Sequence, residues 1–262
     1  MAGPQSNTPN IPNESSISFT RVQYRLSNNR VLLSGLDLEI AAGEITMLLG
    51  RSGSGKTTCL KLINRLLVPT QGEVRVQGVA TTQWDPISLR RHIGYAIQDV
   101  GLFPHYTVEQ NVGLVPRLER WEGKRVRARV QDVLELVRLP ASEFAKRYPD
   151  ELSGGQRQRV GLARALAADP PVLLMDEPFG ALDPLGRIEL QQEFKALQQR
   201  LRKTVVFVTH DVSEALLLAD HIALLQDGQL LGVYTPREFA SSDNPEVRGY
   251  MDAFRSAQQV LA

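Results

Sequence analysis

Residues 50–57 have the types and spacing of a loop that wraps phosphate groups. They are, in order, Gly50, Arg51, Ser52, Gly53, Ser54, Gly55, Lys56 and Thr57, which match the pattern G-x-x-x-x-G-K-[ST]. Glycines let the backbone approach phosphates, and N–H groups at the start of the following helix point at the negative charge. The lysine of this pattern reaches the β- and γ-phosphates, and the hydroxyl of Thr57 binds Mg²⁺. The pattern predicts a nucleoside triphosphate site, with Thr58 directly behind the loop.

The segments on both sides of the loop have the context that such a site requires. Residues 44–49 read as a short buried strand, and residues 57–67 have helical spacing. The apolar residues that this spacing places on one side of the helix are Leu60, Ile63, Leu66 and Leu67. Because strand, glycine loop and helix follow one another, we prefer a phosphate site to a Gly/Ser-rich turn that matches by chance.

Three further predicted strands end in side chains that suit the same site. One ends in Asp176 and Glu177, the next along the chain is followed by His210, and an earlier one ends in Gln98. The carboxyl ends of parallel strands line the ligand crevice of an α/β sheet. We therefore expect Asp176 near the Mg²⁺, Glu177 accepting a proton from the attacking water, and His210 near the γ-phosphate. The amide of Gln98 is expected to coordinate the metal or a water.

A second anion site is predicted at the start of another helix. Its residues are Ser153, Gly154, Gly155 and Gln156. The serine hydroxyl, the backbone N–H groups and the helix dipole all favour an anion there. If both loops hold one ATP, the second must come from a partner copy arranged head to tail, which predicts a two-fold dimer with two nucleotides between the subunits.

The order of predicted elements gives the fold class. Strands and helices alternate after residue 165, which indicates a mainly parallel sheet covered on both faces. An antiparallel β layer is expected at residues 17–22 and 31–40, with Asn28-Asn29 in the turn. Predicted helices span residues 108–115, 124–139, 156–168, 184–202 and 212–219, and the second carries the apolar stripe Val126, Val130, Val133, Leu134 and Val137.

These elements predict one principal domain. The expected divisions are a disordered tail at residues 1–14, an ATPase domain at 15–245 and a short helical extension at 246–262. Within the domain, the core comprises residues 15–98 and 166–245, and a helical subdomain comprises about residues 99–165.

Composition narrows the class of protein. The 262 residues carry a formal net charge of +1, which gives no reason to expect a nucleic-acid partner. No apolar run is long enough to span a bilayer, and the first fourteen residues lack the features of a signal peptide. The one cysteine, Cys59, fits a reducing cytosol and a buried position in the helix behind the phosphate loop.

Taken in order along residues 15–240, these motifs resemble those of ABC-transporter ATPases. The matching segments are residues 50–57, Gln98, residues 152–156, 175–178, 181–183 and His210. The resemblance implies a P-loop NTPase core that binds ATP and Mg²⁺, with Glu177 as general base. It also implies that Lys56 and Gln156 grip phosphate, that Asp176 and Gln98 lie near the metal, and that Asp183 bridges the dimer contacts.

One position departs from the family pattern. An aromatic residue near the end of the first strand stacks on adenine in this family, and Leu26 falls at that place. Tyr24, two residues earlier, is the remaining candidate for an adenine contact. Loss of a stacking ring costs roughly 0.5–1.5 kcal/mol, which weakens ATP binding without abolishing it.

Within the family, residues 62–66, 91–98 and 101–108 resemble the ATPases of osmoprotectant importers, which take up glycine betaine, choline or carnitine. The resemblance implies a separate membrane permease, a substrate-binding protein and a place at the cytoplasmic face of the inner membrane. Residues 99–121, with Phe103, Tyr106 and Trp121, are expected to receive the permease's coupling helix, although Phe103 also suits a small satellite core. Since the chain ends at Ala262, we expect neither paired CBS domains nor the C-terminal β-domain of sugar importers.

Other assignments stay open at this stage. Amino-acid importers share the Phe-Pro-His of residues 103–105, and a lipid- or metal-trafficking ABC ATPase also fits the motifs. A soluble ABC ATPase that acts on ribosomes normally has two cassettes, whereas this chain has one. DNA-repair ATPases of the superfamily carry a long coiled coil between the two loops, and only about a hundred residues separate them here.

Overall fold

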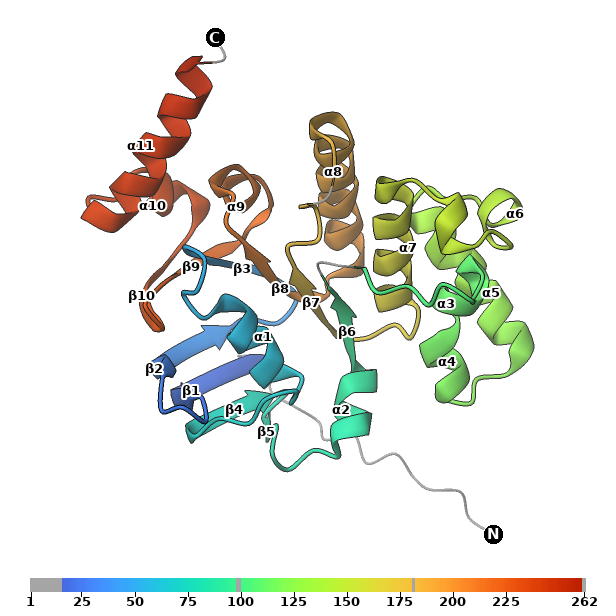
Figure 1. The fold of residues 1–262 in the computed structure, drawn as a ribbon, viewed down its shortest axis with the longest axis horizontal. Helices are drawn as coiled ribbons and strands as arrows, with labels where there is room; N and C mark the ends of the chain where they lie inside the picture. Colours follow the sequence, from blue (N-terminus) through green and yellow to red (C-terminus); the bar gives the residue numbers. More distant parts are fainter. Residues whose placement is uncertain (1–15, 98–99, 181, 261–262) are drawn as a thin grey trace.

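The computed structural model describes residues 16–97, 100–180 and 182–260, in which helices pack on two β-sheets (Figure 1). The larger sheet has the strand order β10-β9-β3-β8-β7-β6. Its strands are β3 (Ile45–Leu49), β6 (Ile93–Ala96), β7 (Val172–Asp176), β8 (Thr204–Thr209), β9 (His221–Gln226) and β10 (Gln229–Tyr234). All neighbours pair in parallel except β10, which pairs antiparallel with β9. The predicted mainly parallel sheet is confirmed, and the predicted tail at residues 1–14 lies outside the described residues.

The apolar runs of this sheet are explained by burial on both faces. Every residue of β3, β7 and β8 is buried. Successive side chains point to opposite faces, so Leu48 packs in one apolar cluster while Met47 and Leu49 pack in the other. Helix α1 (Lys56–Ile63) and the smaller sheet cover the first face, whereas α7 (Gly154–Leu166), α8 (Pro184–Leu201) and α9 (Val212–Leu218) cover the second.

The smaller sheet is the predicted antiparallel layer. Its strand order is β2-β1-β4-β5, with bounds Val31–Ile40, Ile17–Arg25, Gln71–Val76 and Val79–Ala80 in that order. Phe19 lies opposite Leu38, and both are buried against the larger sheet. The β1–β2 turn closes at Asn28-Asn29, where Asn29 has a φ of 66° that asparagine tolerates. This hairpin confirms the predicted turn between the first two strands. In the larger sheet, Asp227-Gly228 form the turn between β9 and β10.

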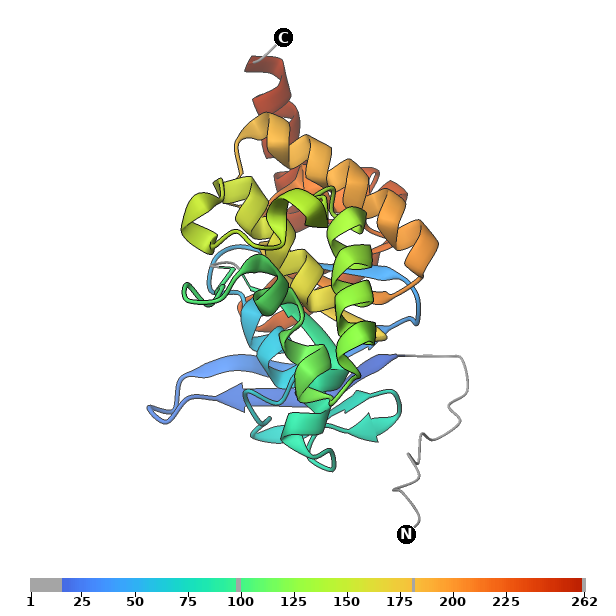
Figure 2. The ribbon, with the colours of Figure 1, turned by 90° about the vertical axis from the view of Figure 1, so that its right-hand side faces the viewer.

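A group of helices is inserted between β6 and β7, and Figure 2 views the molecule from its side. Its members are α3 (Val108–Val112), α4 (Leu114–Leu118), α5 (Gly123–Leu136), α6 (Ala141–Phe144), the 3₁₀ turn η1 (Pro149–Glu151) and α7. The predicted apolar stripe of α5 is buried throughout, and it belongs to the same cluster as the second face of the larger sheet. The group is therefore packed on the sheet through a continuous apolar core.

The structure corrects two predicted helices. Helix α1 ends at Ile63 instead of residue 67, because Asn64 caps it and its side chain accepts the N–H of Leu66. Leu66 is 49% exposed, so it does not share the buried side of the helix with Leu60 and Ile63. The predicted helix at residues 108–115 is two short helices that meet at Gly113. Pro116 explains the break, because a proline cannot donate to the carbonyl four residues earlier and clashes with it.

Three further helices complete the described chain. Helix α2 (Pro86–His92), which is not among the predicted elements, is capped by Asp85, whose side chain accepts the N–H of Ser88. Helix α10 (Pro236–Ala240) starts with a capping box at Thr235, and α11 (Pro245–Val260) packs Val247 against the core. None of the described helices has the length and apolarity of a membrane span.

Candidate active site

The phosphate loop leaves the end of β3 and enters α1 directly, as the sequence predicts. Gly53 and Gly55 have φ values of 81° and 102°, a region that favours glycine. A Cβ at Gly55 would also lie 2.6 Å from the Cδ2 atom of Leu33 and 3.1 Å from the carbonyl oxygen of Leu32. The loop can keep its course only if this position stays glycine, because β2 packs directly behind it.

Lys56 lies inside this loop. Its side chain is buried, and Nζ donates to the carbonyl oxygens of Gly50 at 2.7 Å and Arg51 at 2.9 Å. Burial lowers the pKa of the ammonium, while the nearby carboxylates of Glu177 and Asp176 raise it. The loop's own carbonyls thus hold the ammonium within the loop, at the lysine position of the phosphate-binding pattern.

A hydroxyl and a carboxylate meet at the start of α1. The Oγ1 of Thr57 donates to the Oδ1 of Asp176 at 3.2 Å, and Asp176 is the last residue of β7. Asp176 is only 8% exposed, and burial raises its pKa, with the hydrogen bond from Thr57 acting in the opposite direction. Oxygen ligands of these two kinds suit Mg²⁺, and a divalent cation would stabilise the buried carboxylate. Thr57 and Asp176 therefore fit the predicted metal site, whereas Gln98 lies outside the described residues.

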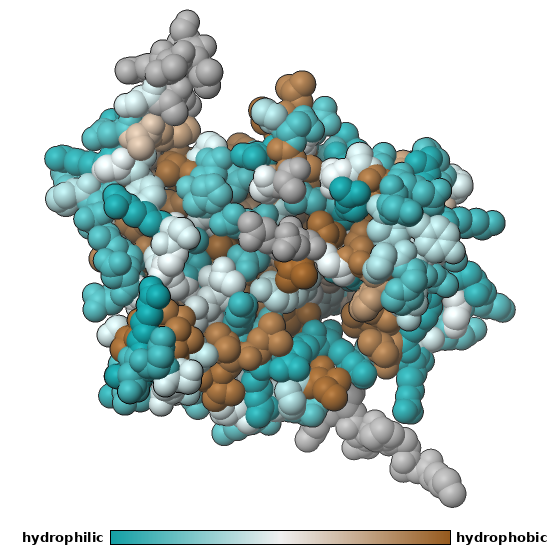
Figure 3. Space-filling view, in the orientation of Figure 1, coloured by the Kyte–Doolittle hydropathy of each residue, from teal (hydrophilic) through white to brown (hydrophobic). Residues whose placement is uncertain are grey.

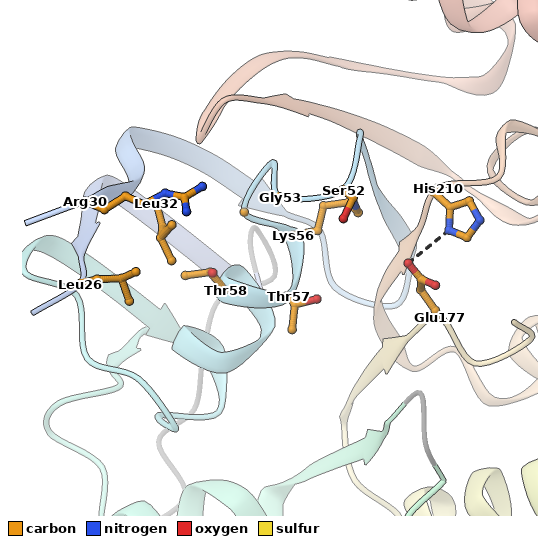
Figure 4. A pocket seen from close by; sticks show the side chains of 11 residues that line it. Leu26, Arg30, Leu32, Ser52, Gly53, Lys56, Thr57, Thr58, Glu177 and His210 are labelled. Carbon is orange, nitrogen blue, oxygen red and sulfur yellow. Dashed lines mark hydrogen bonds and ion pairs between the residues drawn. The ribbon is translucent and has the colours of Figure 1, made fainter. Parts of the chain in front are cut away.

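Glu177 and His210 come together because their strands are neighbours. Strands β7 and β8 pair in parallel, with Asp176 opposite Val208, and the two side chains extend just beyond these ends. The Nδ1 atom of His210 lies 3.2 Å from the Oε1 atom of Glu177, and a hydrogen bond to the carboxylate joins them (Figure 4). Glu177 has a φ of 46°, which is rare for a residue with a side chain, and backbone strain of this kind clusters at functional sites.

One cavity of about 840 Å³ collects most of these groups. Its lining residues are Leu26, Arg30, Leu32, Ser52, Gly53, Gly55, Lys56, Thr57, Thr58, Glu177 and His210. Figure 4 shows Leu26, Arg30 and Leu32 at the far end from Glu177 and His210, with the phosphate loop between them. The cavity is elongated, with one end beside the strand-end groups and the other beside the β1–β2 hairpin.

Sequence reasoning missed two of the lining residues at the hairpin end. Leu26 was singled out as the residue at the adenine position, but Arg30 and Leu32 were not among the candidates. Tyr24 is not one of the lining residues; it pairs with Leu33 across the sheet and packs against the cluster of the smaller sheet. The predicted turn at Asn28-Asn29 was the available signal, because a tight turn places the residues on its two sides close together.

The second predicted anion loop does not line this cavity. Ser153 caps α7: its Oγ accepts the N–H of Gln156 at 3.2 Å, and the Oε1 of Gln156 accepts the N–H of Ser153 at 2.9 Å. Asp183 likewise caps α8 by accepting the N–H of Gly186. The segment before α7 and the segment before α8 are neighbours, since a Cβ at Gly155 would lie 3.2 Å from the Cδ2 atom of Leu182. They form a separate surface that carries helix N-terminal donors.

The fold and the cavity define the class first: a P-loop nucleotide-binding protein, with a phosphate loop between β3 and α1 and an acidic end on β7. Residues 33–180 match the family described as ABC transporter. The chain belongs to this ABC transporter family, which confirms the predicted family and fold class.

Relatives agree with this assignment. The chain is 52% identical over 222 residues to OpuCA, the glycine betaine/carnitine/choline transport ATP-binding protein of Bacillus subtilis (strain 168), a match that covers 85% of this chain and 58% of OpuCA. It is 48% identical over 215 residues to YehX, the glycine betaine uptake system ATP-binding protein of Escherichia coli (strain K12), covering 82% of this chain and 69% of YehX. This chain therefore spans less than two thirds of the length of OpuCA.

Solved structures resemble the chain over most of its length. The dimeric structure of MJ0796, a bacterial ABC transporter cassette, superimposes with a TM-score of 0.75 at 36% identity and covers 84% of this chain and 99% of that one. A dimeric post-hydrolysis state of the same cassette, bound to ADP and Pi, gives the same TM-score at 35% identity and covers the same shares of the two chains.

Proposed function

We propose that this chain is the ATP-binding and ATP-hydrolysing subunit of a bacterial ABC importer, which energises uptake of an osmoprotectant such as glycine betaine or another quaternary amine. The observation that carries the proposal is that one cavity is lined by Lys56, Thr57, Glu177 and His210. The names of OpuCA and YehX support the substrate class.

The chemistry of hydrolysis follows from the placement of these groups. The loop at residues 50–58 binds the phosphate chain through its backbone N–H groups and Lys56. Thr57 and Asp176, together with the predicted ligand Gln98, would hold Mg²⁺, and the bound ion would neutralise phosphate charge. Glu177 orients the attacking water and accepts its proton, while His210 fixes the Glu177 carboxylate through the 3.2 Å contact. Most of the rate acceleration then comes from positioning and charge stabilisation.

A second copy of the chain completes the site. The loop formed by Ser153, Gly154, Gly155 and Gln156 carries donors but lies outside the cavity of its own subunit. In a head-to-tail dimer it closes over the γ-phosphate bound by the partner copy, with Asp183 at the contact between them. The dimeric cassette structures support this arrangement.

A groove beside the inserted helices is the proposed contact with the permease. It has a volume of about 320 Å³, and its lining includes Tyr95, Phe103, Leu114 and Val115. Figure 3 shows apolar residues gathered on the surface between β6 and α4, and Phe103 is 41% exposed. Such a groove suits the apolar face of a helix from a membrane subunit. The chain would then lie at the cytoplasmic face of the inner membrane and act on a substrate-binding protein only through the permease.

Uptake of labelled glycine betaine after a salt upshift tests this function. It is compared between the native strain and a strain that carries Glu177→Gln, after any redundant betaine carrier has been removed. We expect uptake of betaine to be lost and uptake of unrelated solutes to be unchanged. Normal betaine uptake in the variant strain would remove the substrate assignment and turn the search to amino-acid, lipid or metal transport.

A further inference from the structure

Three side chains of the β1–β2 hairpin line the end of the cavity away from Glu177. They are Leu26, Arg30 and Leu32, and none of the three is aromatic. Figure 4 shows the two leucine side chains beside Thr58, with the Arg30 guanidinium extending from the turn toward Gly53. This end therefore combines two apolar side chains with one planar cation.

Backbone hydrogen bonds at the turn fix Leu26 and Arg30 opposite each other. The N–H of Leu26 donates to the carbonyl of Arg30 at 2.9 Å, and the N–H of Asn29 donates to the carbonyl of Leu26 at 2.9 Å. The N–H of Arg30 donates to the side chain of Asn28 at 3.1 Å. The backbone positions from which the Leu26 and Arg30 side chains extend are thus fixed by hydrogen bonds.

Leu32 is held against the phosphate loop by its own backbone. In the hairpin register Tyr24 lies opposite Leu33 and Arg25 opposite Val31, so Leu32 is the extra residue of a bulge. Bulges turn a side chain away from its regular direction and recur beside active sites. A Cβ at Gly228 would lie 2.4 Å from the carbonyl oxygen of Leu32, which places the β9–β10 turn against this bulge.

The same turn ties the hairpin to the loop. The N–H of Gly228 donates to the carbonyl of Ser54 at 3.2 Å, and the carbonyl of Gly228 accepts the N–H of Ser34 at 2.9 Å. One residue therefore bridges the phosphate loop and β2. These bonds set the distance between the phosphate loop and the hairpin. A nucleotide held by its phosphates in this cavity would therefore find Leu26, Arg30 and Leu32 at a fixed distance.

The chemistry of this wall suits the faces of a purine. Leucine side chains offer apolar contact, and the flat guanidinium of arginine stacks on aromatic rings through dispersion and cation–π attraction. None of the ion pairs found between the described residues uses Arg30. Lys56 and the backbone N–H groups of the loop are the groups expected to bind the phosphates. Arg30 instead extends from the turn beside two leucines, so it is placed to contact another part of the nucleotide.

In this family an aromatic ring near the end of the first strand stacks on adenine, and this chain has Leu26 at that place. We infer that the Arg30 guanidinium stacks on the base in place of the missing ring, with Leu26 and Leu32 in apolar contact beside it. The inference rests on the proposed nucleotide-binding function and adds to it the residues that recognise the base. Arg30 acts here through its plane as well as its charge, which separates it from a residue that only attracts phosphate.

Binding of two probes by the purified full chain tests the inference. MgATP contains the base, and magnesium tripolyphosphate contains the phosphates alone. We expect Arg30→Ala to weaken MgATP binding about five- to tenfold and to leave tripolyphosphate binding within about twofold. Arg30→Lys is expected to lose nearly as much MgATP affinity as Arg30→Ala, because an ammonium keeps the charge and lacks the plane. Arg25→Ala is the matched control, since Arg25 is exposed in the same hairpin and does not line the cavity.

A ring placed at position 26 provides a rescue. We expect Leu26→Tyr combined with Arg30→Ala to recover most of the lost MgATP affinity, again with unchanged tripolyphosphate binding. Tripolyphosphate binding also reports that the loop is folded in each variant.

Three results would overturn the inference. Arg30→Ala that weakens both probes equally would assign Arg30 to the phosphates, and Arg30→Lys that binds like the wild type would assign its effect to charge alone. Unchanged MgATP binding by Arg30→Ala would show that Arg30 does not contact the bound nucleotide. Failure of the nucleotide site itself would differ from all three, because the wild-type chain would bind neither probe.

Discussion

The two ends of the cavity differ in how they are built. At the phosphate end, the functional groups extend from the carboxyl ends of buried parallel strands, and Asp176 is itself buried. At the base end, they come from an exposed hairpin turn whose residues 27–31 are all solvent-accessible. The phosphate end must place charges and a proton acceptor to within a fraction of an ångström. The base end needs only a flat or apolar surface at the right distance, so it tolerates a change of residue type.

Substitutions at the two ends should therefore have effects of different size. At the phosphate end each group has a partner whose geometry depends on it, such as Thr57 with Asp176 and His210 with Glu177. At the base end, backbone hydrogen bonds of the hairpin and of Gly228 hold the residues in position. The side chains there contribute only the surface that a base would contact. We therefore expect large, position-specific losses at one end and small, replaceable losses at the other.

The largest effect is expected for Lys56→Ala. It removes the ammonium that the loop holds between the carbonyls of Gly50 and Arg51, so MgATP affinity should fall by about a hundredfold or more. Isothermal titration measures this loss. Lys124→Ala is the control, because Lys124 is exposed at the start of α5 and does not line the cavity, so affinity should stay within about twofold. Equal affinities for Lys56→Ala and the wild type would show that the loop does not use its lysine.

Gly55→Ala should destabilise the fold as well as the site. The new alanine would have to adopt a φ of 102°, and its Cβ would press on Leu33 and Leu32. Together these two effects should lower the free energy of unfolding by roughly 2–3 kcal/mol. A thermal melt should show a Tm lower by about 4–12 °C. Gly123→Ala, at the start of α5, meets an atom no closer than 3.7 Å and serves as the control that should melt at or above the wild-type temperature. Melting of Gly55→Ala at the same temperature would mean that β2 yields to the added methyl group.

Asp176→Asn should make the fold more stable while weakening the binding of Mg²⁺ with ATP. Burial raises the pKa of Asp176, so the folded protein binds that proton more tightly than the unfolded chain, and stability falls as pH rises from the ordinary aspartate pKa through the folded one. Asparagine still accepts from Thr57 but carries no charge. We expect its Tm to exceed that of the wild type by about 2–4 °C at pH 8, with a smaller difference at pH 4.

The metal completes that test. Added Mg²⁺ with ATP should stabilise the wild type more than Asp176→Asn, because the variant lacks the carboxylate. A variant that is less stable than the wild type at pH 8, or that gains as much from MgATP, would contradict this account of Asp176.

The smallest effect is expected for Tyr24→Leu. Tyr24 pairs with Leu33 and packs on the cluster of the smaller sheet, so leucine should keep most of the packing and leave the Kd for MgATP within about twofold. The stability loss should be about 1 kcal/mol. A tenfold loss of affinity, with tripolyphosphate binding unchanged, would instead support Tyr24 as the base contact.

The phosphate end was more predictable from the sequence than the base end, for a physical reason. The loop and the acidic strand end are local patterns, because a glycine loop must follow one strand and two carboxylates must end another. The meeting of Glu177 with His210 followed from the rule that parallel strands end at one edge. The base end depends on the bulge at Leu32, which is defined by how β1 pairs with β2. That pairing joins two strands, so neither strand's own residues specify which position is the extra one.

The ends of helices can be predicted only when residues that cap or interrupt a helix are considered together with apolar spacing. The alternation of apolar residues continued past Asn64 and Gly113, but a side-chain cap ended the first helix and Pro116 divided the second. Helix α2 carried a readable signal in Asp85 and Pro86, an N-cap followed by a proline in the first turn. The joining of the inserted helices to the sheet in one apolar cluster is a tertiary property that no local pattern contains.

The most direct test of the central claim is ATP hydrolysis by the purified chain and by Glu177→Gln, with the oligomeric state measured by light scattering in MgATP. Glutamine keeps the size of the side chain and loses the proton acceptor. We expect MgATP binding close to that of the wild type, hydrolysis reduced by about a hundredfold or more, and a stable dimer in the variant. Hydrolysis at near the wild-type rate by Glu177→Gln would contradict the role of Glu177 and, with it, the chemistry assigned to this end of the cavity.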